Sequence, residues 1–446
     1  MAQKEGFYSS DEITKVITNL TGRYKMYSAQ GKSLGGNSAI TVFNRKPDAD
    51  YDDSKQKQVV FYGGMYGSLT ASAQVLSFAE NYCMNLRKTN KYDHLFESFK
   101  FVFLPIANGP AYEEAYKLKN SSSKDSPVTS NSEETKEGIQ QVFVDSENTV
   151  LLISIQGIGS DIVGGRKDSV ELTEEQRYAY KRLYDNKKYK SPDSNSGSLF
   201  NYVLGKEKYI VQYEHEAKKK LVREDLDEEF KEEFTELFDR LNSALAKPKI
   251  VFDKARENRD PTKKKPSTIT FYLNVTNNYF FQLEGNLVFN ITVNYEDKER
   301  RLEFIRVEES YLKLYDDEDE ISNVEGSVGE ANITSSEDEN IYYQVTLSNF
   351  VFGSFTKHIF KIKFERTIGG RIKFDTDTKL EAESYYFSTV TSKSRGDFVS
   401  LKEDSDDTAD APKQVVLFIM MLLFLLIILV IVCVFLVNSK SNKLIP

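Results

Sequence analysis

The first half of the chain alternates short, continuous apolar runs with segments of helical spacing. The apolar runs cover residues 59–62, 101–104 and 150–155. Runs of this length without polar alternation are typical of central strands in a sheet that helices cover on both faces. The pattern predicts an α/β domain over residues 1–250, with a mixed sheet between helices. A serine-rich stretch at 120–134 interrupts this domain and predicts a surface loop.

An apolar stripe at helical spacing lies near the end of this domain. Its members are large apolar side chains, and Glu, Asp and Lys occupy the opposite face. The stripe consists of Leu226, Phe230, Phe234, Leu237, Phe238, Leu241 and Leu245. This arrangement predicts a long amphipathic helix. Packing on the α/β domain is the favoured interpretation, and docking of a partner is the alternative.

Beyond residue 250 the period of the apolar positions changes to two. A charged, proline-bounded stretch at 251–266 predicts a linker. Alternating segments follow at 269–275, 287–295, 341–347 and 360–364. Several short segments of this kind predict an antiparallel β-sandwich over residues 267–391. The polar and acidic residues 392–414 predict a stalk.

Residues 415–437 form an apolar run of 23 residues without a charge. At about 1.5 Å per residue, such a helix is long enough to cross a hydrocarbon core of about 30 Å. The run predicts a single transmembrane helix, followed by a short tail at 438–446. Lys440 and Lys443 lie in the tail, whereas the stretch before the run is acidic. The positive-inside rule therefore predicts a cytosolic tail and an extracellular or lumenal bulk.

That orientation normally requires a signal peptide, and residues 1–20 contain no apolar core of the kind a signal peptide has. Two interpretations stay open. Either a signal peptide is missing from this sequence, or the protein is tail-anchored with its bulk in the cytosol. Five Asn-x-Ser/Thr sequons favour the first interpretation. They predict a glycoprotein with candidate sites at Asn19, Asn120, Asn274, Asn290 and Asn332.

Charge and the few cysteines and histidines limit which partners and metal sites this chain can have. The net charge of −9 and the lack of a basic stripe argue against a nucleic-acid partner, because binding phosphate backbones needs clustered Lys and Arg. Cys83 and Cys433 are the two cysteines, which excludes a disulfide framework and a zinc site of the cysteine type. Any histidine metal centre must draw on three residues, His94, His215 and His358.

Five segments of the α/β half follow one another in a consistent order and spacing. They are residues 7–36, 59–74, 101–116, 151–159 and 197–214, among them VVFYGGMYGS, FVFLPIANGPAY and LLISIQGIG. Together they resemble the zinc metallocarboxypeptidases, which have the carboxypeptidase A/E-like fold. The resemblance is collinear over about residues 7–245. It implies that 59–74 correspond to the segment carrying the first two zinc ligands, 151–159 to the third, and 197–214 to the segment ending in the catalytic Glu.

The zinc ligands of that family are replaced here. The family uses His-x-x-Glu and a later His, because imidazole and carboxylate suit zinc and leave one position for water. At the matching positions this chain has Tyr66, Leu69 and Gln156. Glu214 alone matches the general base. The resemblance therefore implies a degenerate member that lacks its zinc ligands, with no cofactor expected.

We interpret the chain as a membrane-anchored pseudoenzyme whose former cleft binds a peptide or a protein. Side chains that would line this cleft are Tyr66, Asn108, Tyr112, Gln156 and Glu214. The Asn-Arg pair with which the family grips the substrate carboxylate has no counterpart in residues 117–127. One alternative is a divergent membrane-bound metallocarboxypeptidase that removes C-terminal residues. Another is a structural or sorting membrane protein in which the sandwich makes the contacts.

Overall fold

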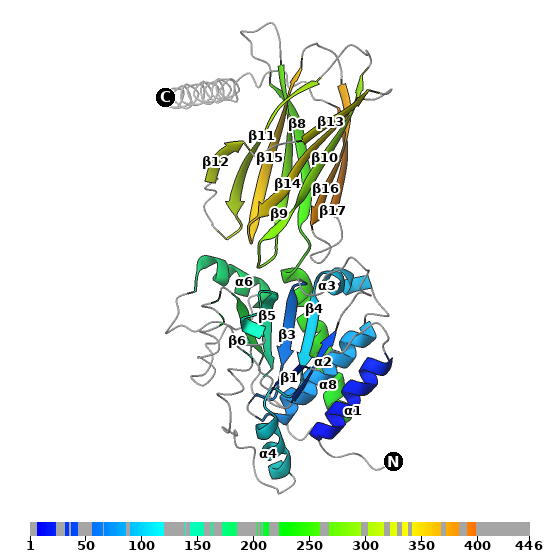
Figure 1. Ribbon diagram of the computed structural model, residues 1–446, viewed down its shortest axis with the longest axis vertical. Helices are drawn as coiled ribbons and strands as arrows, with labels where there is room; N and C mark the ends of the chain where they lie inside the picture. The colour runs from blue at the N-terminus through cyan, green and yellow to red at the C-terminus, as the bar shows by residue number, and fades with distance from the viewer. Residues whose placement is uncertain are drawn as a thin grey trace, which may run out of the picture.

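The structure, a computed structural model, consists of an α/β domain and a β-sandwich joined end to end (Figure 1). It describes residues 7–23, 32–34, 37–42, 56–65, 67–85, 90–119, 139, 143–155, 162–163, 172–184, 203, 206, 208–213, 223–258, 267–295, 302–315, 322–327, 332–337, 341–366, 372–382 and 390–397.

A seven-stranded sheet forms the centre of the α/β domain, with the strand order β1-β2-β4-β3-β5-β7-β6. Its strands are β1 (Lys32–Leu34), β2 (Asn37–Val42), β3 (Gln58–Tyr62), β4 (Lys100–Leu104), β5 (Thr149–Ile155), β6 (Ile162–Val163) and β7 (Tyr209–Tyr213). The four central strands are parallel, whereas β1, β2 and β6 pair antiparallel. The predicted mixed sheet is confirmed, and the three apolar runs are β3, β4 and β5.

The helices with described bounds pack on one face of this sheet, and the helical residues Ile139 and Val203 lie on the other, so the predicted helical cover of the second face is described only in part. The helical elements are α1 (Ser10–Arg23), α2 (Leu69–Asn85), η1 (Asn90–Tyr92), α3 (Asp93–Ser98), α4 (Gly109–Lys119), α6 (Glu174–Tyr184) and α8 (Arg223–Ala244). Strand residues such as Phe61 and Phe103 pack against this helical layer, whereas Val60 and Leu152 face a second cluster that includes Phe143 and Val203. Strands buried on both faces lack polar alternation for this reason.

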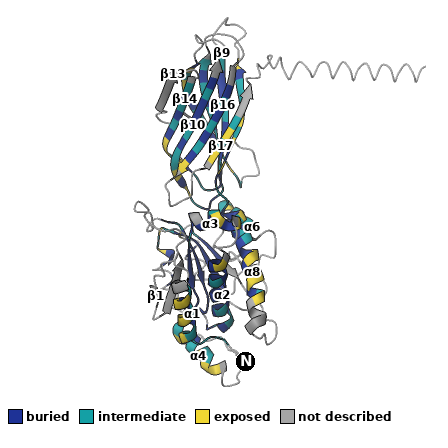
Figure 2. Ribbon diagram, turned by 90° about the vertical axis from the view of Figure 1, so that its right-hand side faces the viewer, coloured by how far each residue is buried: buried dark blue, intermediate teal, exposed yellow. Residues whose placement is uncertain are grey.

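The predicted amphipathic helix is α8, and its apolar stripe packs on the domain. Phe238 is buried and stacks on Phe61 at 5.9 Å between ring centroids and on Phe234 at 4.2 Å. Opposite this stripe, α8 presents exposed charged residues, as does α1 (Figure 2). From Phe230 to Leu245 the stripe lies in the core, so this part is not available as a docking surface.

The second domain contains two five-stranded antiparallel sheets, ordered β13-β14-β10-β16-β17 and β12-β11-β15-β9-β8. The strands are β8 (Lys249–Asn258), β9 (Ser267–Asn277), β10 (Leu283–Tyr295), β11 (Leu302–Lys313), β12 (Ser322–Ser327), β13 (Asn332–Glu337), β14 (Ile341–Phe352), β15 (Thr356–Arg366), β16 (Ile372–Ala382) and β17 (Val390–Asp397). Aromatic rings meet between the sheets, for example Phe271 with Phe289 and Tyr343 with Phe364. The predicted sandwich is present.

Two boundaries differ from those that composition predicts. The linker expected at 251–266 begins with strand, because β8 pairs with β9 and continues to Asn258. Lys254 and Arg256 contact the ring of Tyr272 on the outer face, whereas Glu257 is buried and accepts a hydrogen bond of 2.6 Å from Ser267. Likewise β17 includes the first residues of the stalk expected at 392–414 and pairs with β16. Strands β8 and β17 are edge strands with a solvated face. Such strands carry many polar residues, so their sequences resemble those of linkers.

The two domains share one apolar core. At their junction Tyr178 of α6 packs edge-on against Phe355 at 5.1 Å, and Phe99 packs against Tyr279 at 5.6 Å. Arg182 donates hydrogen bonds of 2.8 Å to the carbonyl oxygens of Asn278 and Ser243. The two aromatic contacts and the hydrogen bond to Asn278 cross the junction, whereas the bond to Ser243 ties α6 to α8 within the α/β domain.

The apolar run at 415–437, the tail at 438–446 and most of the stalk lie outside the described residues. In the part of the chain that the structure describes, none of the helices combines the length and the apolar composition of a membrane span. The predicted span therefore stays a prediction from sequence.

Candidate functional site

The turn between β3 and α2 sits where the family resemblance expects the first zinc ligands. It requires glycine at two positions, because Gly64 and Gly67 have φ of +67° and +76°. A β-carbon on Gly67 would also lie 2.7 Å from the carbonyl oxygen of Ala111. Ser68 then caps α2, with its Oγ accepting a hydrogen bond of 3.2 Å from the backbone N–H of Ala71. The backbone N–H of Gly67 donates a hydrogen bond of 3.2 Å to the carbonyl oxygen of Gly64 within this turn.

The neighbouring turn, between β4 and α4, is tied to the first. The backbone N–H of Ala107 donates to the carbonyl oxygen of Gly63 at 2.8 Å. Asn108, expected in the cleft lining, accepts a hydrogen bond of 3.1 Å from the N–H of Ala111 through its side-chain oxygen. It is 1% exposed, so it acts as the buried N-cap of α4.

Tyr112, the other described residue expected in the cleft lining, is also 1% exposed. Its hydroxyl donates a hydrogen bond of 2.5 Å to the carbonyl oxygen of Tyr8. Burial raises the pKa of this phenol far above its usual range, and the charges of Glu113 and Glu12 raise it further. Tyr112 therefore stays a neutral hydrogen-bond donor that fastens the segment before α1 to α4.

Leu69 is the first residue of α2, and its side chain is 5% exposed within the main apolar core. This is the position at which the resemblance expects a carboxylate ligand. Leucine has no lone pair, so this position cannot bind zinc. Tyr66, Gln156 and Glu214 lie outside the described residues.

No group of three His, Cys, Asp or Glu that could hold a metal occurs in the part of the chain that the structure describes. His94 makes a 3.2 Å hydrogen bond with the carbonyl oxygen of Leu245, and Cys83 is buried in α2. His358 is buried in the sandwich, where its ring nitrogens contact Glu309 at 2.5 Å and Thr356 at 2.9 Å. Of the three positions that the resemblance assigns to zinc ligands, Leu69 lies in the described part of the chain, and its side chain does not fit zinc.

The sequons occupy different environments. Asn19 is exposed on α1, and Asn274 is half-buried in β9. Asn290 of β10 is 8% exposed, and its side-chain oxygen accepts a hydrogen bond of 3.0 Å from Gln344. Asn332 begins β13, and Asn120 lies outside the described residues. Glycosylation at these positions stays a prediction.

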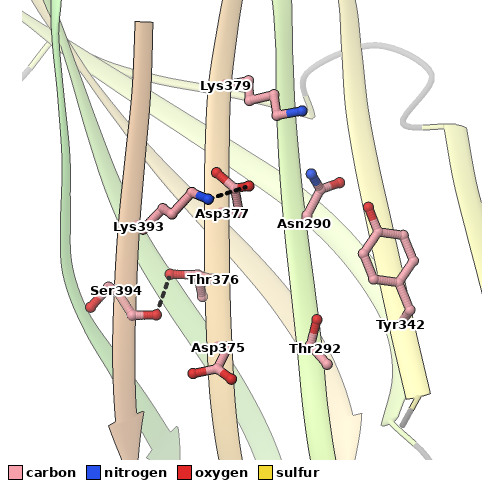
Figure 3. Close-up of a pocket in the computed structure, with 9 residues that line it drawn as sticks. All are labelled: Asn290, Thr292, Tyr342, Asp375, Thr376, Asp377, Lys379, Lys393 and Ser394. Carbon is pink, nitrogen blue, oxygen red and sulfur yellow. Dashed lines mark hydrogen bonds and ion pairs between the residues drawn. The ribbon is translucent and has the colours of Figure 1, made fainter.

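A second candidate site, which the sequence did not indicate, is a hollow of about 630 Å³ on the outer face of the sandwich. We call it the sheet hollow. Residues of β14, β10, β16 and β17 line it (Figure 3). These are Asn290, Thr292, Tyr342, Asp375, Thr376, Asp377, Lys379, Lys393 and Ser394.

No protein-family model and no curated protein matches the chain. Metallocarboxypeptidases of known structure do match it, over about half of its length and at low identity. Thrombin-activatable fibrinolysis inhibitor is 15% identical, over 53% of this chain and 74% of that chain, with a TM-score of 0.38. A metallo-carboxypeptidase from Burkholderia cenocepacia is 12% identical, over 53% and 70%, with a TM-score of 0.36. The collagen-binding domain of a Staphylococcus aureus adhesin matches 33% of this chain and 98% of its own, at 10% identity and a TM-score of 0.20.

Proposed function

We propose that this protein is a membrane-anchored, carboxypeptidase-like protein that does not catalyse hydrolysis and instead binds a peptide or a protein. The observation that carries the proposal is Leu69. Its side chain is buried in the apolar core at the position where the family supplies a carboxylate to zinc.

The chemistry of the replaced ligands supports the loss of catalysis. Zinc in such sites lowers the pKa of a bound water to about 7 and polarises the scissile carbonyl. A phenol and an amide, from Tyr66 and Gln156, are poor substitutes for imidazole, and Leu69 offers no donor. Without the metal, a general base at Glu214 has no activated water to deprotonate.

The binding role rests on the retained scaffold. Backbone hydrogen bonds join the turns after β3 and β4, from Gly63 N–H to the Leu104 carbonyl at 3.0 Å and from Ala107 N–H to the Gly63 carbonyl at 2.8 Å. Gly64 and Gly67 shape the first of these turns. Strand ends of this kind form the usual binding crevice of α/β sheets. Tyr66, Gln156 and Glu214 are the side chains that we assign to the crevice, because Asn108 and Tyr112 are closed off in the fold.

C-terminal trimming of a peptide mixture tests the proposal. The full chain in detergent is incubated with zinc and a pool of synthetic peptides, and mass spectrometry detects products shortened by one C-terminal residue. Glu214→Gln is the matched control. We expect no trimming above this variant, together with retention of some peptides on the immobilised chain. Trimming that disappears in Glu214→Gln would establish the divergent carboxypeptidase instead, and retention of no peptide would favour the structural or sorting protein.

The membrane assignment is a separate proposal, supported by the apolar run at 415–437 and by the sequons. We place the bulk of the chain in a lumen or outside the cell. Expression in eukaryotic cells, followed by enzymatic removal of N-glycans, should increase the electrophoretic mobility of the membrane-bound protein. A membrane-bound protein whose mobility does not change, and whose bulk is digested by protease added to the cytosolic side, would show the tail-anchored topology.

A further inference from the structure

The sheet hollow is built from two rows of side chains that cross the sheet. Tyr342, Thr292 and Asp375 are register partners on β14, β10 and β16. In the adjacent row, Asn290 is paired with Asp377, which is paired with Lys393 of β17. Partners in a row lie about 5 Å apart, and successive rows on one face lie about 7 Å apart. The hollow therefore offers a regular grid of polar groups (Figure 3).

The grid retains hydrogen-bonding capacity. Asp377 faces Lys393 at 3.8 Å, which is an ion pair but longer than a hydrogen bond. Its other carboxylate oxygen is buried and finds no hydrogen-bond donor among the described residues, so it is an unsatisfied acceptor behind the surface that a ligand would contact. Partial burial raises the pKa of Tyr342, and the nearby charge of Asp377 adds to this, so its phenol stays protonated. A ligand would meet both acceptors and donors.

The charges of the hollow balance. Asp375 and Asp377 offset Lys379 and Lys393, so the lining has no net charge that would select an anion or a cation. Aliphatic side chains are absent from the lining that the structure describes, and the ring of Tyr342 is its aromatic surface. An extended peptide needs apolar pockets for its side chains and normally pairs with a sheet edge, whereas this hollow lies on a sheet face.

We propose that the sheet hollow binds a neutral oligosaccharide. Each sugar hydroxyl both donates and accepts, which matches the mixed grid of carboxylate, amide and ammonium groups. The apolar face of a pyranose ring packs on an aromatic ring such as that of Tyr342. The volume of about 630 Å³ lies within the range of about 300–1,000 Å³ that is common for ligand sites. This binding is independent of the function proposed for the α/β domain.

Saturation-transfer NMR on the full chain tests this proposal, because the method detects weak binding. The protein is held in a polyoxyethylene detergent, since sugar-based detergents would compete. The probes are neutral pentasaccharides of mannose, glucose, xylose and N-acetylglucosamine, with a chondroitin sulfate hexasaccharide as the charged comparison. We expect signal from at least one neutral probe, and at least tenfold weaker binding of that probe in Tyr342→Ala and in Asp377→Ala.

Tyr272→Ala is the matched control, because Tyr272 is a half-buried tyrosine on the outer face of the other sheet. It should bind the probe as the unaltered chain does, and thermal unfolding should show that all variants fold. The proposal is overturned if no neutral probe binds, if the sulfated probe alone binds, or if Tyr272→Ala weakens binding as much as Tyr342→Ala.

A glycan on Asn290 would fill the hollow, so the proposal requires this sequon to be unmodified. Peptide mapping of protein from eukaryotic cells should find Asn290 free, even where Asn19 or Asn274 carries a glycan. Full glycan occupancy at Asn290 would contradict the proposal.

Discussion

Phe355 offers a sharp test of the junction between the two domains. It lies in the turn between β14 and β15, has a φ of +47°, and is fully buried. Its ring packs against Tyr178 at 5.1 Å and Phe280 at 5.6 Å, and the guanidinium of Arg182 lies 5.7 Å from its centroid. A bulky residue in the left-handed region is unusual, so its packing must compensate for backbone strain.

The expected changes in the free energy of unfolding follow from these contacts. Phe355→Ala removes the ring and leaves a cavity, which costs about 3–5 kcal/mol. Alanine still bears the left-handed penalty of about 1–2 kcal/mol, whereas glycine avoids it and loses only about 0.5–1 kcal/mol through its greater freedom when unfolded. Phe355→Gly should therefore be more stable than Phe355→Ala by roughly 1 kcal/mol.

Urea unfolding of the full chain in detergent measures both variants. The chain has no tryptophan, so tyrosine fluorescence and circular dichroism serve as signals. Phe352 is the matched control, because it is equally buried but lies in strand β14. There the order should invert, with Phe352→Gly less stable than Phe352→Ala. If glycine is the worse replacement at both positions, the reasoning from the left-handed turn is refuted.

Three further changes follow from the same structure. Gly67→Ala should destabilise the chain by more than about 2 kcal/mol in thermal or urea unfolding, because the alanine β-carbon would clash with the carbonyl of Ala111. Unchanged stability would contradict the geometry of this turn. Arg182→Met should lower the free energy of unfolding by about 2–4 kcal/mol, since two backbone carbonyls lose a charged donor. It should also separate the unfolding transitions of the two domains. A single unshifted transition would show that Arg182 does not couple the domains. Glu308 is partly buried, which raises its pKa, but the hydrogen bonds from Lys363 and Arg306 outweigh this and hold the pKa below 4.5. The stabilisation by this ion pair is therefore present above that value and lost as the pH falls through the folded pKa. Lys363→Met should flatten the acid limb of a curve of stability against pH. An unchanged acid limb would show that the pair of Glu308 and Lys363 does not contribute to it.

The elements that could be predicted are those with a single clear period. The apolar runs became β3, β4 and β5, and the stripe at 226–245 became α8. Strand β16 was harder to predict, because threonines such as Thr376 and Thr378 occupy its inward positions. Strand β11 carries a bulge after Phe304 that interrupts its alternation.

At the candidate sites, too, local motifs could be predicted, whereas contacts between distant segments could not. Motif order was enough to place Leu69 at the start of a helix after β3, but it could not show that Asn108 and Tyr112 use their polar atoms within the fold. Asn108 is used by its own helix as a cap, and Tyr112 is used by the chain segment before α1, which is distant in sequence. The sheet hollow joins residues from Asn290 to Ser394, which share no local motif and meet only through strand register.

Zinc content, measured by elemental mass spectrometry, decides whether this chain is a carboxypeptidase-like protein without its metal. The full chain in detergent is incubated with zinc and dialysed, alongside Gln156→Ala, Glu214→Ala and, as a control for adventitious histidine binding, His94→Ala. We expect well below one zinc per chain, with no dependence on Gln156 or Glu214. One zinc per chain that is lost in Gln156→Ala or Glu214→Ala, but kept in His94→Ala, would contradict it.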